Sequence, residues 1–201
     1  MTRDRRILFF GDSFVAGVGD PTGLGWVGRV VAAAHAAGRP LTAYNLGVRR
    51  DTSLDVAARW QAEARARIGP AEASYGVVFG LGVNDTAEED GRVRVAPGVA
   101  ADALGALLDA ALELDLRAFV VGPPPAGEPA QDERVCALSE RFARLAGARG
   151  VPFVETATAL ARGAPQWSRE AAANDGSHPG AGGYAALARV VLDGGFLDWL
   201  G

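Results

Sequence analysis

The chain has 201 residues, of which 49% are hydrophobic and 22% are charged, and its formal net charge is −4 at pH 7. This balance predicts one folded domain over residues 1–201 with a proper core, and it argues against disorder. A negative charge without a basic run argues against nucleic acid as a partner, because duplex binding draws most of its affinity from neutralising phosphates.

Residue types that are absent or rare exclude several kinds of site. All 20 basic residues are arginine, so the sequence lacks the lysine of a pyridoxal-phosphate Schiff base and of a Walker phosphate loop. One cysteine, Cys136, and two histidines cannot form an intrachain disulfide or a typical zinc site. We therefore expect no metal and no cofactor, and we expect Cys136 to be a buried, inert thiol.

The N-terminal residues 1–6 lead into only four large apolar residues, at 7–10. Such a run is too short for the apolar core of a signal peptide or for a membrane span. We therefore expect no membrane span and a cytoplasmic location.

Five short runs rich in Val, Ile and Phe predict β-strands. They lie at residues 7–10, 41–46, 77–81, 119–121 and 151–154. Between and after them, apolar residues recur every three or four positions, which predicts amphipathic helices. These helices are expected around residues 27–34, 51–68, 104–112, 135–145 and 184–191. The alternation predicts an α/β fold, a three-layer sandwich with a five-stranded parallel sheet and helices on both faces.

The helix at residues 51–68 has the weakest apolar pattern but clear end signals. Asp51 or Thr52 can cap its start, and Gly69 with Pro70 predicts its end.

Residues suited to catalysis follow the predicted strands. Ligands of open parallel sheets bind at the carboxyl ends of the strands. Residues 11–13 follow the first strand, Gly47 the second and residues 82–85 the third, while the loop at residues 175–178 precedes the last helix. We expect these segments to meet at one edge of the sheet.

A serine, a histidine and a carboxylate are the parts of an activated nucleophile. Because His178 is one of only two histidines, a mechanism that needs a general base near neutral pH depends on it. Ser13 would attack an ester carbonyl, His178 would take its proton, and Asp175 would hold the imidazole in the required tautomer. Asp12 is expected to cap or bond loop backbone rather than to react.

A developing oxyanion would be held by the backbone N–H groups of Ser13 and Gly47 and by the side-chain amide of Asn84. Glycine lets the backbone approach the substrate, and asparagine is a neutral donor. Each residue also has an ordinary explanation: Ser13 or His178 could cap a helix, and Asn84 could form an Asx turn. Their joint placement at one sheet edge favours the catalytic interpretation.

Four sequence blocks, taken together, resemble the signature blocks of the SGNH hydrolases, also called GDSL-type esterases and lipases. They are Gly-Asp-Ser-Phe at residues 11–14, Asn-Leu-Gly at 45–47, Gly-Val-Asn-Asp at 82–85 and Asp-Gly-Ser-His-Pro at 175–179. The resemblance spans nearly the whole chain and implies a flavodoxin-like fold. It implies Ser13 as nucleophile and oxyanion donor, Gly47 and Asn84 as donors, and Asp175 and His178 as the rest of the triad.

One residue departs from the family's first block, where Phe14 replaces the leucine. We expect this change to alter packing, not chemistry. The segment is not a Gly-x-Ser-x-Gly elbow, since position 15 is valine, and this disfavours the α/β-hydrolase fold. Residues 17–22 do not match a dinucleotide fingerprint, and we expect residues 17–26 to form a loop over one side of the site.

The sequence therefore predicts a serine esterase that cleaves small or medium-chain carboxylic esters or thioesters through an acyl-enzyme. Two alternatives use the same triad: an acyltransferase and a carbohydrate O-deacylase. From another class, the chain could be a non-catalytic module that binds a small ligand.

Phe14, Val83 and Trp167 are candidates for an acyl pocket and equally for ordinary packing. Residues 196–200 are apolar enough to seal against the core or to mediate self-association, so a homo-oligomer stays open.

Overall fold

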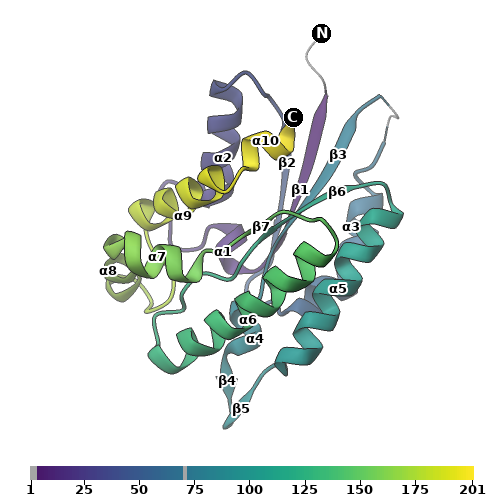
Figure 1. Ribbon diagram of the computed structural model, residues 1–201. Coiled ribbons are helices and arrows are strands. Elements are labelled where there is room, and N and C mark those ends of the chain that lie inside the picture. Colours follow the sequence, from purple (N-terminus) through teal and green to yellow (C-terminus); the bar gives the residue numbers. More distant parts are fainter. Residues whose placement is uncertain (1–3, 70–71) are drawn as a thin grey trace.

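The apolar runs form one parallel sheet in the computed structural model, which describes residues 4–69 and 72–201. Its five strands lie in the order β2-β1-β3-β6-β7 (Figure 1). Their bounds are β1 Arg5–Gly11, β2 Thr42–Gly47, β3 Ser74–Gly80, β6 Arg117–Val121 and β7 Phe153–Val154. The chain moves one way from β1 to β2 and the other way from β3 onward, which is the flavodoxin-like order. A topological switch point therefore lies beside the end of β1.

Helices cover both faces of the sheet, which confirms the predicted three-layer α/β fold (Figure 1). One face carries α2 Gly25–Ala36, α7 Ala157–Gly163, α8 Pro165–Ala173, α9 Ala181–Asp193 and α10 Phe196–Leu200. The other face carries α3 Ser53–Arg65, α5 Pro97–Glu113 and α6 Pro129–Ala148. Two short helices, α1 Ser13–Ala16 and α4 Val83–Thr86, follow β1 and β3, and a hairpin of β4 Glu88–Glu89 and β5 Arg92–Val93 follows α4.

The core consists of two hydrophobic clusters, one on each face of the sheet. In β1, Ile7 and Phe9 join the cluster under α2 and α9, whereas Leu8 and Phe10 join the cluster under α3 and α5. Because both faces of β1, β3 and β6 are buried, these strands contain continuous apolar runs instead of alternating with polar residues, whereas the edge strand β2 has no buried residue.

Helix α3 shows how the local sequence sets an element. Thr52 is its N-cap: the Thr52 hydroxyl accepts a hydrogen bond from the Asp55 N–H, and the Asp55 carboxylate accepts one from the Thr52 N–H. This capping box selects Thr52 over Asp51 as the cap. The helix ends at Arg65, before Gly69, while the predicted contribution of Pro70 lies outside the described residues.

One sequence-based expectation about the fold is wrong. Cys136 is exposed and not buried. On α6 the buried positions include Val135, Leu138 and Phe142, so the residue directly after Val135 points away from the core.

The C-terminal residues 196–200 pack against the core, which is one of the two roles expected for them. Phe196 is fully buried and packs on Phe9 and Phe119, and Trp199 packs on Phe119. In residues 4–69 and 72–201, no helix has both the length and the apolarity needed to cross a membrane.

Candidate active site

Ser13 stands at the carboxyl end of β1, as the first residue of α1. Asp12 is the N-cap of α1, because its Oδ1 accepts a hydrogen bond of 2.9 Å from the Phe14 N–H and its carbonyl accepts one of 3.0 Å from the Ala16 N–H. The structural role expected for Asp12 is confirmed. The first N–H groups of a helix have no partner within the helix, so the Ser13 N–H points out of α1 without an i−4 acceptor.

Ser13, His178 and Asp175 form one continuous hydrogen-bonded path. The Ser13 Oγ lies 2.7 Å from His178 Nε2, and His178 Nδ1 lies 2.7 Å from Asp175 Oδ2. Although partial burial of Asp175 opposes its charge, hydrogen bonds from the backbone and ring of His178 and from the Ser177 N–H lower its pKa to about 2. An ionised carboxylate only accepts hydrogen bonds, so Nδ1 carries the ring proton and Nε2 is the acceptor for the Ser13 hydroxyl.

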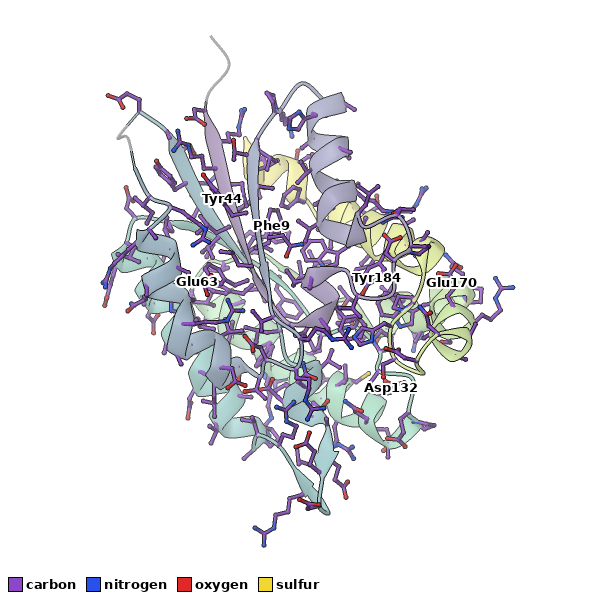
Figure 2. The ribbon with its side chains drawn as sticks, turned by 180° about the vertical axis from the view of Figure 1, so that it is seen from behind. Phe9, Tyr44, Glu63, Asp132, Glu170 and Tyr184 are labelled. Atoms are coloured by element: carbon purple, nitrogen blue, oxygen red, sulfur yellow. The ribbon has the colours of Figure 1, made fainter. Side chains whose placement is uncertain are left out.

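The histidine segment is held by a loop from the other end of the chain, at residues 17–24. The Asn174 side-chain amide donates to the carbonyls of Gly19 and His178, each at 3.2 Å. Tyr184, which is labelled in Figure 2, donates a hydrogen bond of 2.7 Å to the Val18 carbonyl. The loop therefore lies against the histidine segment, as expected, but it ends at residue 24 and not at residue 26, because Gly25 and Trp26 begin α2.

Gly19 lies in close contact with the histidine segment. It has φ +89°, and a Cβ atom built there would stand 3.0 Å from the His178 Cβ and 2.8 Å from the Pro179 carbonyl oxygen. A side chain at position 19 would push His178 away from Ser13.

Gly47 lies at the end of β2 in close contact with α1. A Cβ atom at this position would stand 2.3 Å from the Ala16 nitrogen, so only glycine allows the approach. The Gly47 N–H donates a 3.1 Å hydrogen bond to Asn45 Oδ1, and the Asn45 amide in turn donates to the Val15 carbonyl at 2.8 Å. A substrate oxygen would share or replace Asn45 Oδ1 as the acceptor.

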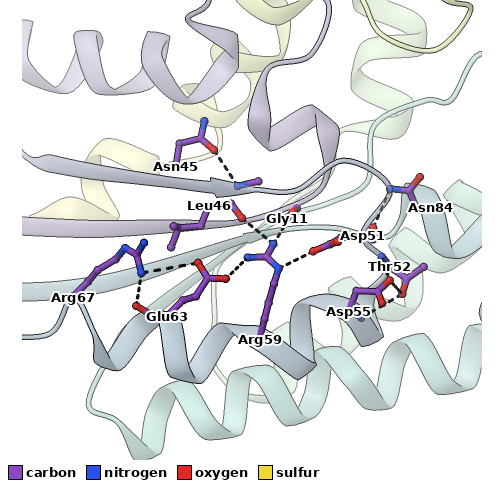
Figure 3. A network of polar contacts seen from close by, with 11 residues as sticks. Gly11, Asn45, Leu46, Asp51, Thr52, Asp55, Arg59, Glu63, Arg67 and Asn84 are labelled. Carbon is purple, nitrogen blue, oxygen red and sulfur yellow. Dashed lines mark hydrogen bonds and ion pairs between the residues drawn. The ribbon is translucent and has the colours of Figure 1, made fainter.

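Asn84 lies in α4, directly after β3. Its Nδ2 donates a 2.9 Å hydrogen bond to the Asp51 carbonyl (Figure 3). A side-chain amide has two N–H donors, so one hydrogen bond to Asp51 leaves the second donor for a ligand.

Two buried carboxyl groups lie near the nucleophile. Burial and, to a lesser degree, the Asp85 carboxylate raise the pKa of Asp12 to about 7, against the opposing effect of the hydrogen bond from the Phe14 N–H. Burial also raises the pKa of Asp85, whose carboxylate accepts hydrogen bonds from the Ser53 N–H and hydroxyl. Among the described residues, no three His, Cys, Asp or Glu side chains are grouped so that they could hold a metal ion.

The three residues considered for an acyl pocket are all buried. Phe14, Val83 and Trp167 are 4%, 5% and 1% exposed and belong to the cluster under α2 and α9. The Phe14 ring stacks on Trp167 at 5.7 Å and lies 4.9 Å from the His178 ring. These rings fill the space behind the serine and histidine with their own atoms.

Sequence reasoning missed a polar network that lies under the ends of β1 and β2. Its centre is Arg59 of α3 (Figure 3). The amphipathic pattern does not reveal that Arg59 holds this network together. An arginine between the buried Val56 and Trp60 is expected to face solvent.

Comparisons with known proteins agree with this fold. No curated protein matches the chain by sequence. An acetylxylan esterase from Geobacillus stearothermophilus has a similar structure, with a TM-score of 0.79 and 22% identity over 99% of this chain and 98% of the esterase. Catalytic mutants of that esterase replace a serine, an aspartate or a histidine by alanine.

A lipase/acylhydrolase from Enterococcus faecalis is also similar, with a TM-score of 0.74 and 22% identity over 94% of each chain. At these identities the likeness concerns the fold. A family model, described as the GDSL-like lipase/acylhydrolase family, matches residues 9–186 of the sequence. The chain therefore belongs to the GDSL-like lipase/acylhydrolase family and is a carboxylic ester hydrolase.

Proposed function

We propose that Ser13, His178 and Asp175 are the catalytic triad and that the enzyme hydrolyses esters of short acyl groups through an acyl-enzyme. The unbroken path from Asp175 through His178 to the Ser13 hydroxyl, with 2.7 Å at both steps, carries the proposal. A module that only binds a ligand would have no use for this path.

In the first half of the reaction, Ser13 Oγ attacks the ester carbonyl carbon and its proton passes to His178 Nε2. Asp175 stabilises the resulting imidazolium through Nδ1–H. The tetrahedral intermediate collapses when Nε2 gives the proton to the leaving alcohol oxygen, which leaves an acyl group on Ser13. Water then attacks the acyl-enzyme with His178 as base, and the acid leaves as Ser13 takes back a proton.

The oxyanion of both tetrahedral intermediates would be bound by three donors: the N–H groups of Ser13 and Gly47 and the second amide N–H of Asn84. These donors lie at or just after the carboxyl ends of β1, β2 and β3, the three neighbouring strands at the switch point. Their position beside Ser13 supports the assignment.

The packing behind the triad supports a short acyl group. Phe14 and Trp167 are stacked and buried, so a long chain would have to displace them from the core. Displacing buried aromatic rings costs several kcal/mol. We therefore propose that the enzyme cleaves oxygen esters and thioesters whose acyl group is about the size of acetyl. This size is the small end of the range of small to medium acyl chains that the sequence predicts.

A carbohydrate O-acetyl ester is the second, more specific candidate for the substrate. The similar Geobacillus enzyme is an acetylxylan esterase, and the residue types replaced in its catalytic mutants are those of the triad proposed here. Acyl transfer to an alcohol would use the same acyl-enzyme, and competition between water and an added acceptor distinguishes the two reactions.

The test compares wild type with Ser13→Ala on p-nitrophenyl esters from acetate to palmitate and on acetylated xylo-oligosaccharides. Ser168→Ala, which removes an exposed hydroxyl on α8, is the matched control. We expect turnover that is greatest for acetate, is lost in Ser13→Ala and is kept in the control. Undiminished turnover by Ser13→Ala would place the nucleophile elsewhere, and an optimum at long chains would contradict the short acyl group.

Two other expectations remain predictions, each with its own test. Cell fractionation tests the cytoplasmic location, and light scattering tests a homo-oligomer.

A further inference from the structure

Arg59 makes more contacts with the strand ends below the site than an ordinary surface arginine would. Its Nη2 donates to two main-chain carbonyls, that of Leu46 at 2.8 Å and that of Gly11 at 3.2 Å. Its Nε donates to the Asp51 carboxylate at 2.7 Å and its Nη1 to the Glu63 carboxylate at 2.9 Å (Figure 3). The guanidinium carbon also lies 5.6 Å from the centre of the Phe10 ring, and the side chain is only 21% exposed.

The carbonyl of Leu46 belongs to the same peptide unit as the N–H of Gly47. A trans peptide is planar and points its C=O and N–H in opposite directions, and the described residues contain no cis peptide. A hydrogen bond that fixes the Leu46 oxygen toward α3 therefore fixes the Gly47 N–H toward α1. Because Arg59 is charged, its hydrogen bond also polarises this peptide and strengthens the N–H as a donor.

Asn84 is linked to Arg59 through Asp51. The Asp51 carbonyl accepts the Asn84 amide at 2.9 Å, and the Asp51 carboxylate is held by Arg59 Nε. One guanidinium thus holds the segment that orients the Asn84 side chain as well as the peptide that carries the Gly47 N–H.

We propose that Arg59 is a positioning residue that aims two oxyanion donors, the Gly47 N–H and the Asn84 amide, at one point. This inference rests on the proposed function, because it assumes that these groups stabilise the oxyanion. Arg59 touches no reacting atom, and its effect passes through the Leu46–Gly47 peptide and through Asp51.

The planar shape of the guanidinium is necessary for this role. Four acceptors lie around Arg59 in different directions, and the five N–H donors of arginine form a fixed fork that reaches them together. A lysine ammonium would keep the charge but could not reach both carboxylates and both carbonyls at once.

The variants that test the proposal are Arg59→Met, Arg59→Lys and the matched control Arg67→Met. Arg67 shares the partner Glu63, to whose carbonyl it donates at 2.7 Å, and lies over the Tyr44 ring as Arg59 lies over Phe10. Within residues 4–69 and 72–201, Arg67 makes no hydrogen bond to the strand-end carbonyls of Gly11 and Leu46. Removing Arg67 therefore reproduces the lost charge and ion pair without disturbing the Leu46–Gly47 peptide.

With p-nitrophenyl acetate, we expect Arg59→Met to lower kcat roughly 10- to 100-fold, less than the loss of a whole oxyanion donor, with KM within about twofold of wild type. The rate at which a fluorophosphonate labels Ser13 should fall in parallel. Arg59→Lys should be intermediate or as slow as Arg59→Met, and Arg67→Met should stay within about twofold of wild type. Circular dichroism and the melting temperature establish that each variant is folded.

A double-mutant cycle with Asn84→Ala supplies a measurement that a merely structural arginine would not change. If Arg59 acts through the donors, the combined loss of kcat in Arg59→Met/Asn84→Ala is smaller than the product of the single losses. Multiplicative losses, or equal activity of folded Arg59→Met and Arg67→Met, would overturn the inference. Failure of both Arg59 variants to fold would overturn it too, by making Arg59 a requirement of the fold.

The same measurements distinguish failure of the proposed serine mechanism from failure of the positioning role of Arg59. If wild type and Ser13→Ala have equal activity, the serine mechanism fails. If activity depends on Ser13 but not on Arg59, only the positioning role fails.

Discussion

At the scale of single residues, the amide of Asn84 is the most direct test of how the oxyanion is held. Replacing Asn84 by alanine removes both of its N–H donors, including the one bound to Asp51. We expect kcat for p-nitrophenyl acetate to fall by roughly 10² to 10³, as for the loss of one oxyanion donor, while KM changes little. Steady-state kinetics measure the two constants. A change confined to KM would mean that Asn84 binds the ground state of the substrate instead.

A second prediction concerns the buried carboxyl of Asp12, whose pKa is raised to about 7 from an ordinary 3.8. Between these values the unfolded chain releases this proton while the folded protein keeps it, so the group makes stability fall as pH rises from about 4 to about 7. Asp12→Asn keeps an oxygen for the Phe14 N–H but has no proton to release. We expect its stability relative to wild type to rise by a few kcal/mol over this interval.

Urea unfolding of Asp12→Asn and wild type at several pH values checks this sign. A constant difference between the two proteins from about pH 4 to 7 would show that burial does not raise the pKa of this carboxyl in the folded protein.

The residues at the strand ends could be found from the sequence for a simple reason. Parallel strands align their carboxyl ends, so polar residues and glycines near the ends of apolar runs must meet. Ser13, Gly47 and Asn84 do lie at or just after the ends of three neighbouring strands. Arg59 could not be found in this way. Its role depends on two carbonyl oxygens from different strands, and a sequence pattern carries no information about main-chain acceptors.

At the scale of elements, the loop before α2 and the segment that carries His178 support each other. Asp20 is buried at the base of this loop and accepts hydrogen bonds from the Thr22 N–H and hydroxyl at 2.9 and 2.8 Å and from the Gly25 N–H at 2.9 Å. It also pairs with Arg29. Although burial opposes its charge, Arg29 and the Thr22 donors lower the pKa of Asp20 to about 2.

Asp20→Asn should therefore destabilise the protein at neutral pH by about 1–3 kcal/mol, because Arg29 loses its charged partner and an amide nitrogen replaces one acceptor. The ordinary pKa of 3.8 exceeds the folded value of about 2, so the ionised carboxylate contributes stability above about pH 4 and loses it as pH falls toward 2. Denaturant midpoints of the two proteins should converge over this interval. Midpoints that stay equally far apart would show that charge is not the cause.

Elements were predictable where their apolar pattern was long and regular. Helices α5, α6 and α9 have buried faces that a period of three or four reveals, and β1, β3 and β6 contain buried apolar runs. The hairpin β4–β5 and the helix α8 were not anticipated. The hairpin strands are two residues each and exposed, so they bury too little apolar surface to leave a pattern. Helix α8 buries only Trp167 and Ala171.

At the scale of the whole molecule, one sheet joins both hydrophobic clusters. Neighbouring residues of the same strands, such as Phe9 and Phe10 in β1, belong to opposite clusters. Neither layer of helices could leave the sheet without exposing one face of these strands. This arrangement supports the expectation of a single domain over residues 1–201, which remains a prediction.

The four tryptophans allow a test, because they are divided between the two clusters. Trp26, Trp167 and Trp199 lie in the cluster under α2 and α9, and Trp60 alone lies in the cluster under α3 and α5. In Trp60→Phe, tryptophan fluorescence reports only the first cluster, and in a variant with the other three tryptophans replaced by phenylalanine it reports only the second. If the chain is one cooperative domain, the fluorescence midpoint of each variant in urea will coincide with its own midpoint by far-ultraviolet circular dichroism. A sheet shared by both clusters should allow only one transition. Fluorescence that changes before or after the circular dichroism signal in either variant would therefore mean that one layer of helices unfolds separately from the rest, which would contradict the single domain.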